Sequence, residues 1–212
     1  MDYGIVIEKI HQELKAYWGK GKVADYIPAL AGVEPKRYGI AIETLDGHSF
    51  QVGDADIRFS IQSISKVFAL AMVTRHLGDR IWKFVGREPS GNPFNSLVQL
   101  EYEHGIPRNP FINAGALVVT DRLMSLYEQP KDAILQFVRS ICGNDDIYYD
   151  KHIARSEREH ADRNMALGYL MKSFGNMEND VEDVVDVYCH QCAIAMNCKE
   201  LTRAFLFLAN HG

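Results

Sequence analysis

The 212-residue chain has no run of 18 apolar residues and no cluster of lysines and arginines. The first absence argues against a transmembrane helix. The second, together with a net charge of −5, argues against nucleic acid or an anionic membrane as a partner. The first residues, Met-Asp-Tyr-Gly, do not begin a basic segment with an apolar core behind it, so we expect no signal peptide.

Cysteine is scarce, with four residues, of which Cys189, Cys192 and Cys198 lie close together in the sequence. This spacing is not typical of a secreted disulfide framework, so we expect a reduced, cytoplasmic protein. Cys189 and Cys192 form a C-x-x-C pattern, but no second pair accompanies it and it falls inside a predicted helix. We therefore favour core thiols over a metal or redox site.

Apolar residues make up 47% of the chain, enough for a buried core in one domain or two small ones. Two strand-like stretches at 38–45 and 48–52 flank Asp46-Gly47, which together predict a β-hairpin. Residues 86–113 hold four of the seven prolines and predict a long loop, a type of segment that often carries function. Apolar residues at helical spacing predict helices over 4–18, from 63, from 113, and over 131–142, 156–175, 180–197 and 199–210.

Ser63 and Lys66 lie three residues apart at a predicted helix start and so share a face of the helix. A hydroxyl beside an amine can serve as a nucleophile and its base. The pattern also occurs readily by chance. A polar helix start, with Ser60 or Ser63 as the N-cap and an exposed Lys66, explains it more simply. The motif alone does not decide between these interpretations.

Other polar residues have similar double interpretations. Asn113 could be only the N-cap of the helix that follows it. Residues 156–159 fit a capping box. Glu157 and Asn164, seven residues apart, would share one helix face, as part of a site or as a solvated surface. Tyr26 follows the first predicted helix and, on composition alone, would simply be packed.

Taken together, several blocks of the chain resemble the serine-dependent glutaminases, a family that shares its fold with serine β-lactamases and penicillin-binding proteins. The blocks occur in the family's order along nearly the whole chain, which is far more specific than one Ser-x-x-Lys. They are Gly-Lys-Val-Ala-Asp-Tyr-Ile-Pro-Ala-Leu at 21–30, Phe-Ser-Ile-Gln-Ser-Ile-Ser-Lys at 59–66, Gly-Arg-Glu-Pro-Ser-Gly at 86–91, Asn-Pro-Phe-Ile-Asn-Ala-Gly at 109–115, Ser-Glu at 156–157 and Arg-Asn at 163–164.

The resemblance implies a mixed α/β (α+β) fold of the β-lactamase and transpeptidase type, with an N-terminal β-hairpin and a large helical region, as one domain over 1–212. It also implies hydrolysis of L-glutamine to L-glutamate and ammonia by a homo-oligomer, without a metal or organic cofactor. Ser63 would be the acylated nucleophile, Lys66 its general base and Tyr26 a hydroxyl beside them. The substrate would be held by Ser63, Asn113, Glu157, Asn164 and Tyr188.

Physical chemistry fits these implied roles. A lysine can take the serine proton only when it is uncharged, so Lys66 must be desolvated or lie near groups that disfavour its charge. The Ser63 backbone N–H, at a helix start, can donate to an oxyanion. Glu157 suits the ammonium of free glutamine, while side-chain amides or a tyrosine hydroxyl suit its carboxylate.

The resemblance also implies segments that this sequence does not contain. Members of the family continue with a second catalytic tyrosine, a Lys-Ser-Gly strand and further strands beside the 38–52 hairpin. We therefore expect a copy that lacks its C-terminal strands, with little or no turnover by this chain alone. A two-stranded hairpin is marginal by itself and would leave apolar surface uncovered.

Two other readings compete with a glutaminase. A β-lactam-reactive serine hydrolase also uses Ser-x-x-Lys, but it needs a Ser-Asp-Asn or Tyr-x-Asn triplet after the nucleophile helix, and neither is present. A non-catalytic or complementation-dependent module could keep the helices of the fold without the chemistry. Replacing Ser63 by alanine distinguishes that module from an enzyme.

Overall fold

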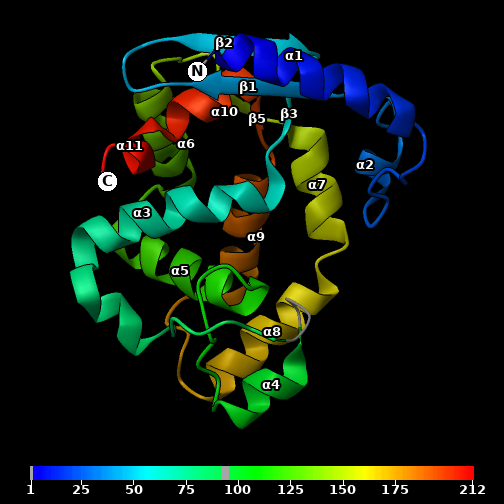
Figure 1. Cartoon of the computed structure of the whole chain (residues 1–212). Helices are drawn as coiled ribbons and strands as arrows, with labels where there is room; N and C mark the ends of the chain where they lie inside the picture. The colour runs from blue at the N-terminus through cyan, green and yellow to red at the C-terminus, as the bar shows by residue number, and fades with distance from the viewer. Residues whose placement is uncertain (1, 92–95) are drawn as a thin grey trace. The chain divides into compact units, whose positions relative to one another are not determined.

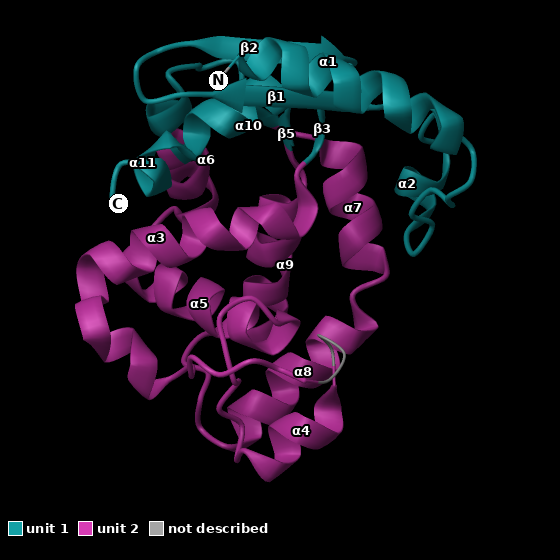
Figure 2. Cartoon of the chain, in the orientation of Figure 1, with its two compact units in different colours: residues 1–60, 138–148, 195–212 teal, residues 61–137, 149–194 magenta. Residues whose placement is uncertain are grey.

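The computed structural model describes residues 2–91 and 96–212 (Figure 1). The chain divides into two compact units, each built from separate stretches of sequence (Figure 2). Unit 1 comprises residues 1–60, 138–148 and 195–212, and unit 2 comprises 61–137 and 149–194. The expectation of one domain over 1–212 stays a prediction, and each unit is described by itself below.

Unit 1 is built on the hairpin of β1 (Gly39–Glu43) and β2 (Ser49–Gly53), which pair antiparallel. Gly47 in the connecting turn has a φ of +88°, a conformation that favours glycine, so the Asp-Gly turn signal is confirmed. Helix α1 (Tyr3–Leu14) packs against β2, and Tyr3 meets Phe50 with ring centroids 6.0 Å apart. The remaining N-terminal elements are the 3₁₀ turn η1 (Lys15–Tyr17) and α2 (Pro28–Ala31).

The C-terminal part of unit 1 returns to the same hairpin. Helix α10 (Cys198–Ala204) packs on β1 and is followed by α11 (Leu206–Ala209). Asn197 and Glu200 form a reciprocal capping box at the start of α10. Strand β3 (Phe59–Ser60) pairs antiparallel with β5 (Ile194–Met196) through the pairs Phe59–Met196 and Ser60–Ala195.

Unit 2 is helical and is centred on α9 (Val181–Cys192), which contacts the 3₁₀ turn η2 (Gln62–Ser65) and three helices (Figure 1). Eight of the twelve residues of α9 are buried, which fits this central position. Its helical neighbours are α5 (Asn113–Leu126), α7 (Lys151–Glu159) and α8 (Asp162–Ser173). The other elements are α3 (Lys66–Leu77), η3 (Gly78–Lys83), α4 (Leu97–Tyr102), α6 (Pro130–Cys142), which continues into unit 1, and β4 (Tyr148–Tyr149) at the boundary of the two units.

A buried polar network joins α5 to the segment before α9. The fully buried Asp121 carboxylate accepts the backbone N–H groups of Glu178 and Asn179, at 3.1 and 2.8 Å. It also pairs with the buried Arg122 guanidinium at 2.5 Å, and Arg122 pairs in turn with Glu178. Each buried charge thus has a partner, as burial of ions requires.

Several predicted elements need correction. The helix predicted over 156–175 is two helices, because α7 already begins after Asp150, whose side chain caps it, and ends at Glu159. The capping box at 156–159 is therefore wrong, and Ser156 is buried within α7. For the same reason, Glu157 and Asn164 do not share one helix face.

Two other segments also differ from the prediction. The predicted loop over 86–113 contains α4, and its residues 92–95 lie outside the described part of the chain. The predicted helix over 180–197 ends at Cys192 and its last residues form β5. The last predicted helix is α10 and α11, with Phe205 between them.

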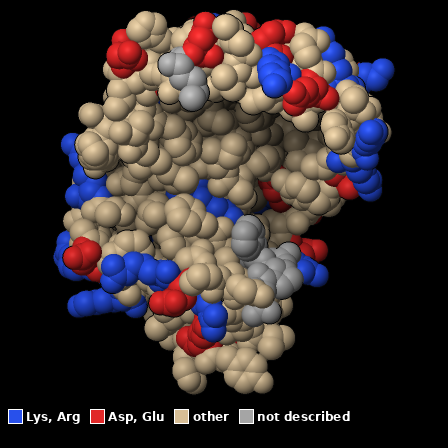
Figure 3. Space-filling view, viewed as in Figure 1, with Lys and Arg blue, Asp and Glu red and all other residues tan. Residues whose placement is uncertain are grey.

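The described surface is of mixed charge. On the face seen in Figure 3, acidic and basic side chains are interspersed, in keeping with the modest net charge of −5. Within residues 2–91 and 96–212, no helix has the length and apolar character needed to cross a membrane. The same residues contain no group of three or more histidine, cysteine or acidic side chains placed to hold a metal ion.

Candidate active site

Ser63 and Lys66 lie where η2 passes into α3. Ser63 is exposed in the 3₁₀ turn, and Lys66 is the first residue of α3, with only 4% of its surface exposed. The expectation of an exposed Lys66 is therefore wrong. The N-cap prediction is also wrong: Ser65 precedes α3, and its hydroxyl donates to the Gln62 carbonyl at 2.8 Å.

The backbone before Ser63 is strained. Gln62 has a φ of +49°, which is uncommon for a residue other than glycine. Such a conformation costs on the order of 1–3 kcal/mol and persists where the surrounding structure fixes it, often at functional sites. The Gln62 conformation therefore determines the direction in which the backbone enters Ser63.

The Lys66 amine is held by two acceptors on the loop and helix that follow in unit 2. Its Nζ donates to the Phe111 carbonyl and to Asn113 Oδ1, both at 2.9 Å. Burial lowers the Lys66 pKa from 10.5 to about 8. Because both partners are acceptors, desolvation and not the neighbours favours the uncharged amine. Among the described residues, none of its hydrogen bonds goes to Ser63.

Two side-chain amides continue this network. Asn113 is the first residue of α5 and not its N-cap, which is Ile112. The Asn113 amide uses its oxygen on Lys66 and donates from Nδ2 to Asn164 Oδ1, 3.2 Å away on α8. Within the described chain, the Asn164 amide nitrogen has no hydrogen-bond partner and so can donate to a ligand.

Tyr188, on the central helix α9, lies beside the Lys66 amine. It is 3% exposed, and the Lys66 Nζ lies 5.9 Å from its ring centroid. Burial raises the pKa of Tyr188 well above its usual value, and the nearby Glu157 carboxylate raises it further. The phenol is therefore neutral and can both donate and accept.

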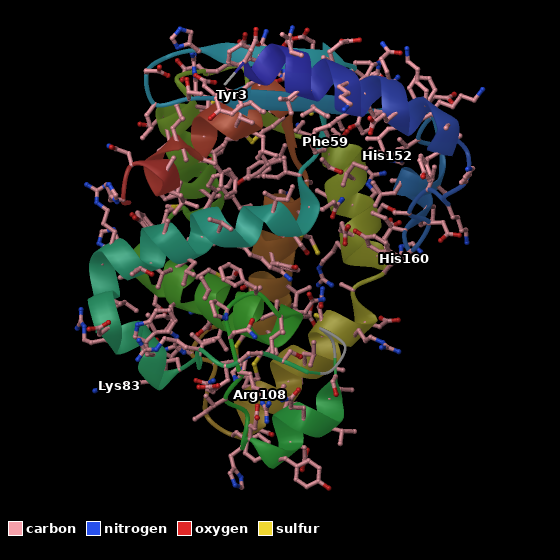
Figure 4. The ribbon with its side chains drawn as sticks, in the orientation of Figure 1. Tyr3, Phe59, Lys83, Arg108, His152 and His160 are labelled. Atoms are coloured by element: carbon pink, nitrogen blue, oxygen red, sulfur yellow. The ribbon has the colours of Figure 1, made fainter. Side chains whose placement is uncertain are left out.

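Glu157 is half-buried and lies on α7. Figure 4 labels two other residues there, His152 near the beginning of this helix and His160 directly after its end. The structure thus brings together five side chains that the sequence had suggested, all within unit 2: Ser63, Lys66, Asn113, Asn164 and Tyr188. Glu157 belongs to the same unit, and its carboxylate is near enough to raise the pKa of Tyr188.

Tyr26 differs from these residues. It belongs to unit 1, directly before Ile27 and α2, and 60% of its surface is exposed. Its place beside Ser63 and Lys66 remains a prediction from the family resemblance.

Three groups of the site were not found from the sequence. The Phe111 carbonyl carries no signal, because every residue has one. Ser65 was not singled out, although it is fully buried. Cys192 was interpreted as a core thiol, and its burial agrees with that, but its thiol also raises the pKa of Tyr188, which lies one turn earlier on α9.

Comparison with known proteins adds independent findings. Residues 21–212 match the family model described as Glutaminase. A glutaminase of Paraburkholderia phytofirmans is 56% identical over 212 residues, which cover this whole chain and 70% of that protein. A probable glutaminase of Bacillus subtilis has a TM-score of 0.88 at 28% identity, covering 100% of this chain and 65% of that one. Mglu in its L-glutamate binding form has a TM-score of 0.81 at 35% identity, covering 90% and 43%.

The fold and the Ser-x-x-Lys turn first define a class: the chain has the β-lactamase-like fold of its structural neighbours. The chain belongs to the glutaminase family, whose members are hydrolases that act on glutamine. It spans about 70% of the length of the curated relative and less than two thirds of the two solved chains.

Proposed function

We propose that unit 2 carries the catalytic serine and lysine of a glutamine amidohydrolase, which converts L-glutamine to L-glutamate and ammonia through an acyl-enzyme on Ser63. One observation carries this proposal. The buried Lys66 amine directs two N–H groups at the Phe111 carbonyl and Asn113 Oδ1. An uncharged amine has only two N–H groups, so its lone pair stays available for a proton.

Acylation follows from this arrangement. The Ser63 oxygen attacks the side-chain amide carbon of glutamine, and its proton passes to the uncharged Lys66 amine. The Ser63 backbone N–H, in the 3₁₀ turn η2 that precedes α3, donates to the oxyanion that forms. When the carbon–nitrogen bond breaks, the Lys66 ammonium gives the proton to the leaving nitrogen, which departs as ammonia, and Ser63 carries a γ-glutamyl ester.

Deacylation reverses these roles. Water attacks the ester carbon while Lys66 accepts one of its protons, and the ester bond breaks to release L-glutamate. Lys66 returns the proton to the Ser63 oxygen, so the enzyme ends in its starting state. These steps need no metal and no organic cofactor.

Recognition of free glutamine requires partners for its ammonium and its carboxylate. Glu157 supplies a carboxylate for the ammonium, and the Asn164 amide nitrogen and the Tyr188 hydroxyl supply donors for the carboxylate. Asn113 keeps the Asn164 amide oriented through the 3.2 Å hydrogen bond between them. The L-glutamate form of Mglu, at 35% identity, supports a site for an amino acid.

The remaining parts of the proposal rest on family resemblance and composition. Tyr26 adds a hydroxyl beside Ser63 and Lys66, and the working enzyme is a homo-oligomer. The protein acts in the cytoplasm, a reducing compartment, which suits the four free cysteines of the described chain.

The test measures ammonia release from glutamine by this chain complemented with the C-terminal segment that the family resemblance implies, and, with added hydroxylamine, formation of γ-glutamyl hydroxamate. Hydroxamate forms when hydroxylamine intercepts the acyl-enzyme in place of water. We expect Ser63→Ala to abolish both products, while Ser173→Ala, an exposed serine on α8, leaves both unchanged. Products that persist in Ser63→Ala would contradict the proposal.

A further inference from the structure

The turn that carries the candidate nucleophile is held by one buried hydroxyl. Ser65 is fully buried, and its Oγ donates to the Gln62 carbonyl at 2.8 Å, across the turn η2. Gln62 is also the residue with a φ of +49°, a conformation that costs energy and persists only where the surrounding structure fixes it. The Ser65 hydroxyl is therefore bonded to the strained residue directly before Ser63.

The Gln62 carbonyl and the Ser63 N–H belong to the same peptide group. The bond between these two residues is trans, and a peptide group is planar. The carbonyl oxygen and the N–H therefore point in opposite directions in one rigid plane. A hydrogen bond that holds the carbonyl toward Ser65 thus also fixes the direction of the Ser63 N–H on the other side. The same bond polarises the peptide group, which makes its N–H a stronger donor.

We propose that Ser65 is a positioning residue, whose hydroxyl orients the peptide group before Ser63 so that the Ser63 N–H meets the oxyanion formed on the substrate. The proposal rests on the function proposed above for Ser63. Without the hydroxyl, Gln62 would relax from its strained conformation and the peptide plane would turn. An oxyanion donor is effective because it is oriented before the charge develops, so the loss of orientation lowers the rate and not the binding of substrate.

The direction of this hydrogen bond distinguishes the role from helix capping. Ser65 is the residue directly before α3, but among the described residues its side chain accepts from no N–H of that helix. Its proton goes back into the turn that carries Ser63 instead. The bond spans only three residues, so it does not tie distant parts of the fold together. Its effect is confined to the orientation of the turn.

Thr120 offers a matched control for the loss of a buried hydroxyl. It is fully buried within α5, and its hydroxyl donates to the Ala116 carbonyl at 2.9 Å. It also accepts from the Gln191 side-chain amide at 3.0 Å. Thr120→Val removes this hydroxyl and keeps the shape of the side chain, so it should lose at least as much stability as Ser65→Ala.

The test uses this chain complemented with the C-terminal segment that the family resemblance implies, and the variants Ser65→Ala, Ser65→Cys and Thr120→Val. Initial rates of ammonia release over a range of glutamine concentrations give kcat and KM separately. The same rates with the side-chain thioamide of glutamine report on the oxyanion donor, because sulfur accepts hydrogen bonds more weakly than oxygen. Denaturant unfolding of each variant measures the stability lost with each hydroxyl.

We expect Ser65→Ala to lower kcat for glutamine about tenfold, the effect of roughly one hydrogen bond, with KM unchanged. Ser65→Cys keeps a weak donor, so its kcat should lie between those of Ser65→Ala and the unaltered chain. The ratio of kcat for glutamine to kcat for the thioamide should fall in Ser65→Ala, because a misdirected donor no longer favours oxygen. Thr120→Val should lose stability but keep both kcat and this ratio.

A hydroxyl with only a structural role would give a different pattern. Ser65→Ala would then lose stability while its oxygen-to-sulfur ratio stayed at the value of the unaltered chain, and this result would overturn the proposal. A kcat for Ser65→Cys no higher than for Ser65→Ala would overturn it as well. If Ser65→Ala does not fold, Ser65→Cys decides: a lowered kcat and ratio support the role, and values equal to those of Thr120→Val refute it.

Ser63→Ala separates this proposal from the proposed function. If Ser63→Ala keeps its turnover, or the complemented chain has none, the nucleophile assignment fails and the role of Ser65 fails with it. If Ser63→Ala abolishes turnover while Ser65→Ala behaves like Thr120→Val, only the positioning role is wrong.

Discussion

Lys66 shows how burial changes the chemistry of one side chain. With a pKa of about 8, about a tenth of the Lys66 amine is uncharged at pH 7, far more than for a lysine in water. The two carbonyl-type acceptors orient the amine without adding a negative charge that would keep it protonated. The site thus combines a fixed position with a usable base.

Asn113→Asp tests this balance at the residue scale. A carboxylate 2.9 Å from Nζ would favour the ammonium, so the pKa of Lys66 should rise. Since the uncharged amine is the base, kcat/KM for glutamine, measured with the C-terminal segment supplied, should then reach its plateau at higher pH than without the substitution. The pH profiles of both proteins measure this shift, and an unchanged midpoint would show that Lys66 is not the group that titrates.

At the scale of elements, the start of α5 depends on a close approach between helix and loop. A Cβ on Gly115 would lie 1.9 Å from the Asn109 carbonyl oxygen, so only glycine fits there. Asn109 Oδ1 in turn accepts the backbone N–H groups of Phe111 and Ile112, at 3.0 and 3.1 Å. This packing places the Phe111 carbonyl that accepts from Lys66.

Gly115→Ala should therefore affect both stability and activity. We expect it to lower the free energy of unfolding by about 1–3 kcal/mol, as overpacking usually does, and to reduce kcat by displacing the Phe111 carbonyl. Gly32→Ala is the control, because a Cβ there meets nothing within 4 Å. Denaturant unfolding of the chain, and initial rates with the C-terminal segment supplied, check the pair, and equal behaviour of the two variants would refute the packing argument.

The elements that local patterns specify were predicted well, and those that depend on competing signals were not. The Asp46-Gly47 turn fixes its own hairpin, so the strands on either side were found. At 156–159 a matching capping box was misleading, because Asp150 begins the helix earlier and that helix ends before Asn164. Only the structure shows which of two local signals is used.

The site was predicted in part for a similar reason. The Ser63 and Lys66 pair is visible because both residues lie in one helical turn, but the hydrogen bonds from Lys66 to Phe111 and Asn113 span 45 and 47 residues. Contacts at such a distance leave no periodic pattern in a single sequence. The resemblance to the glutaminases supplied the partners in advance, and Phe111, acting through its backbone, was missed.

At the scale of the whole molecule, the stability of unit 2 can be tested through its buried polar network. Unit 2 depends on the Asp121 network, whose carboxylate holds the 178–179 backbone against α5. Asp121→Ala should lower the free energy of unfolding by about 3 kcal/mol or more, since it leaves buried donors and the Arg122 charge without their partner.

Asp183→Ala, which removes an exposed carboxylate from α9, is the matched control and should change stability by no more than about 0.5 kcal/mol. Denaturant unfolding measures both variants. A loss in Asp121→Ala no larger than the loss in Asp183→Ala would mean that the buried network does not stabilise unit 2.

The central claim is that one buried lysine amine loses its proton at a pH where ordinary lysines keep theirs. An NMR titration of the chain with ¹³C-labelled lysine Cε measures this directly, with Lys66→Arg to assign the signal. The account predicts one lysine that titrates near pH 8 and is missing from the variant. If every lysine keeps its proton to about pH 10, the usual value for an exposed lysine, the account is contradicted.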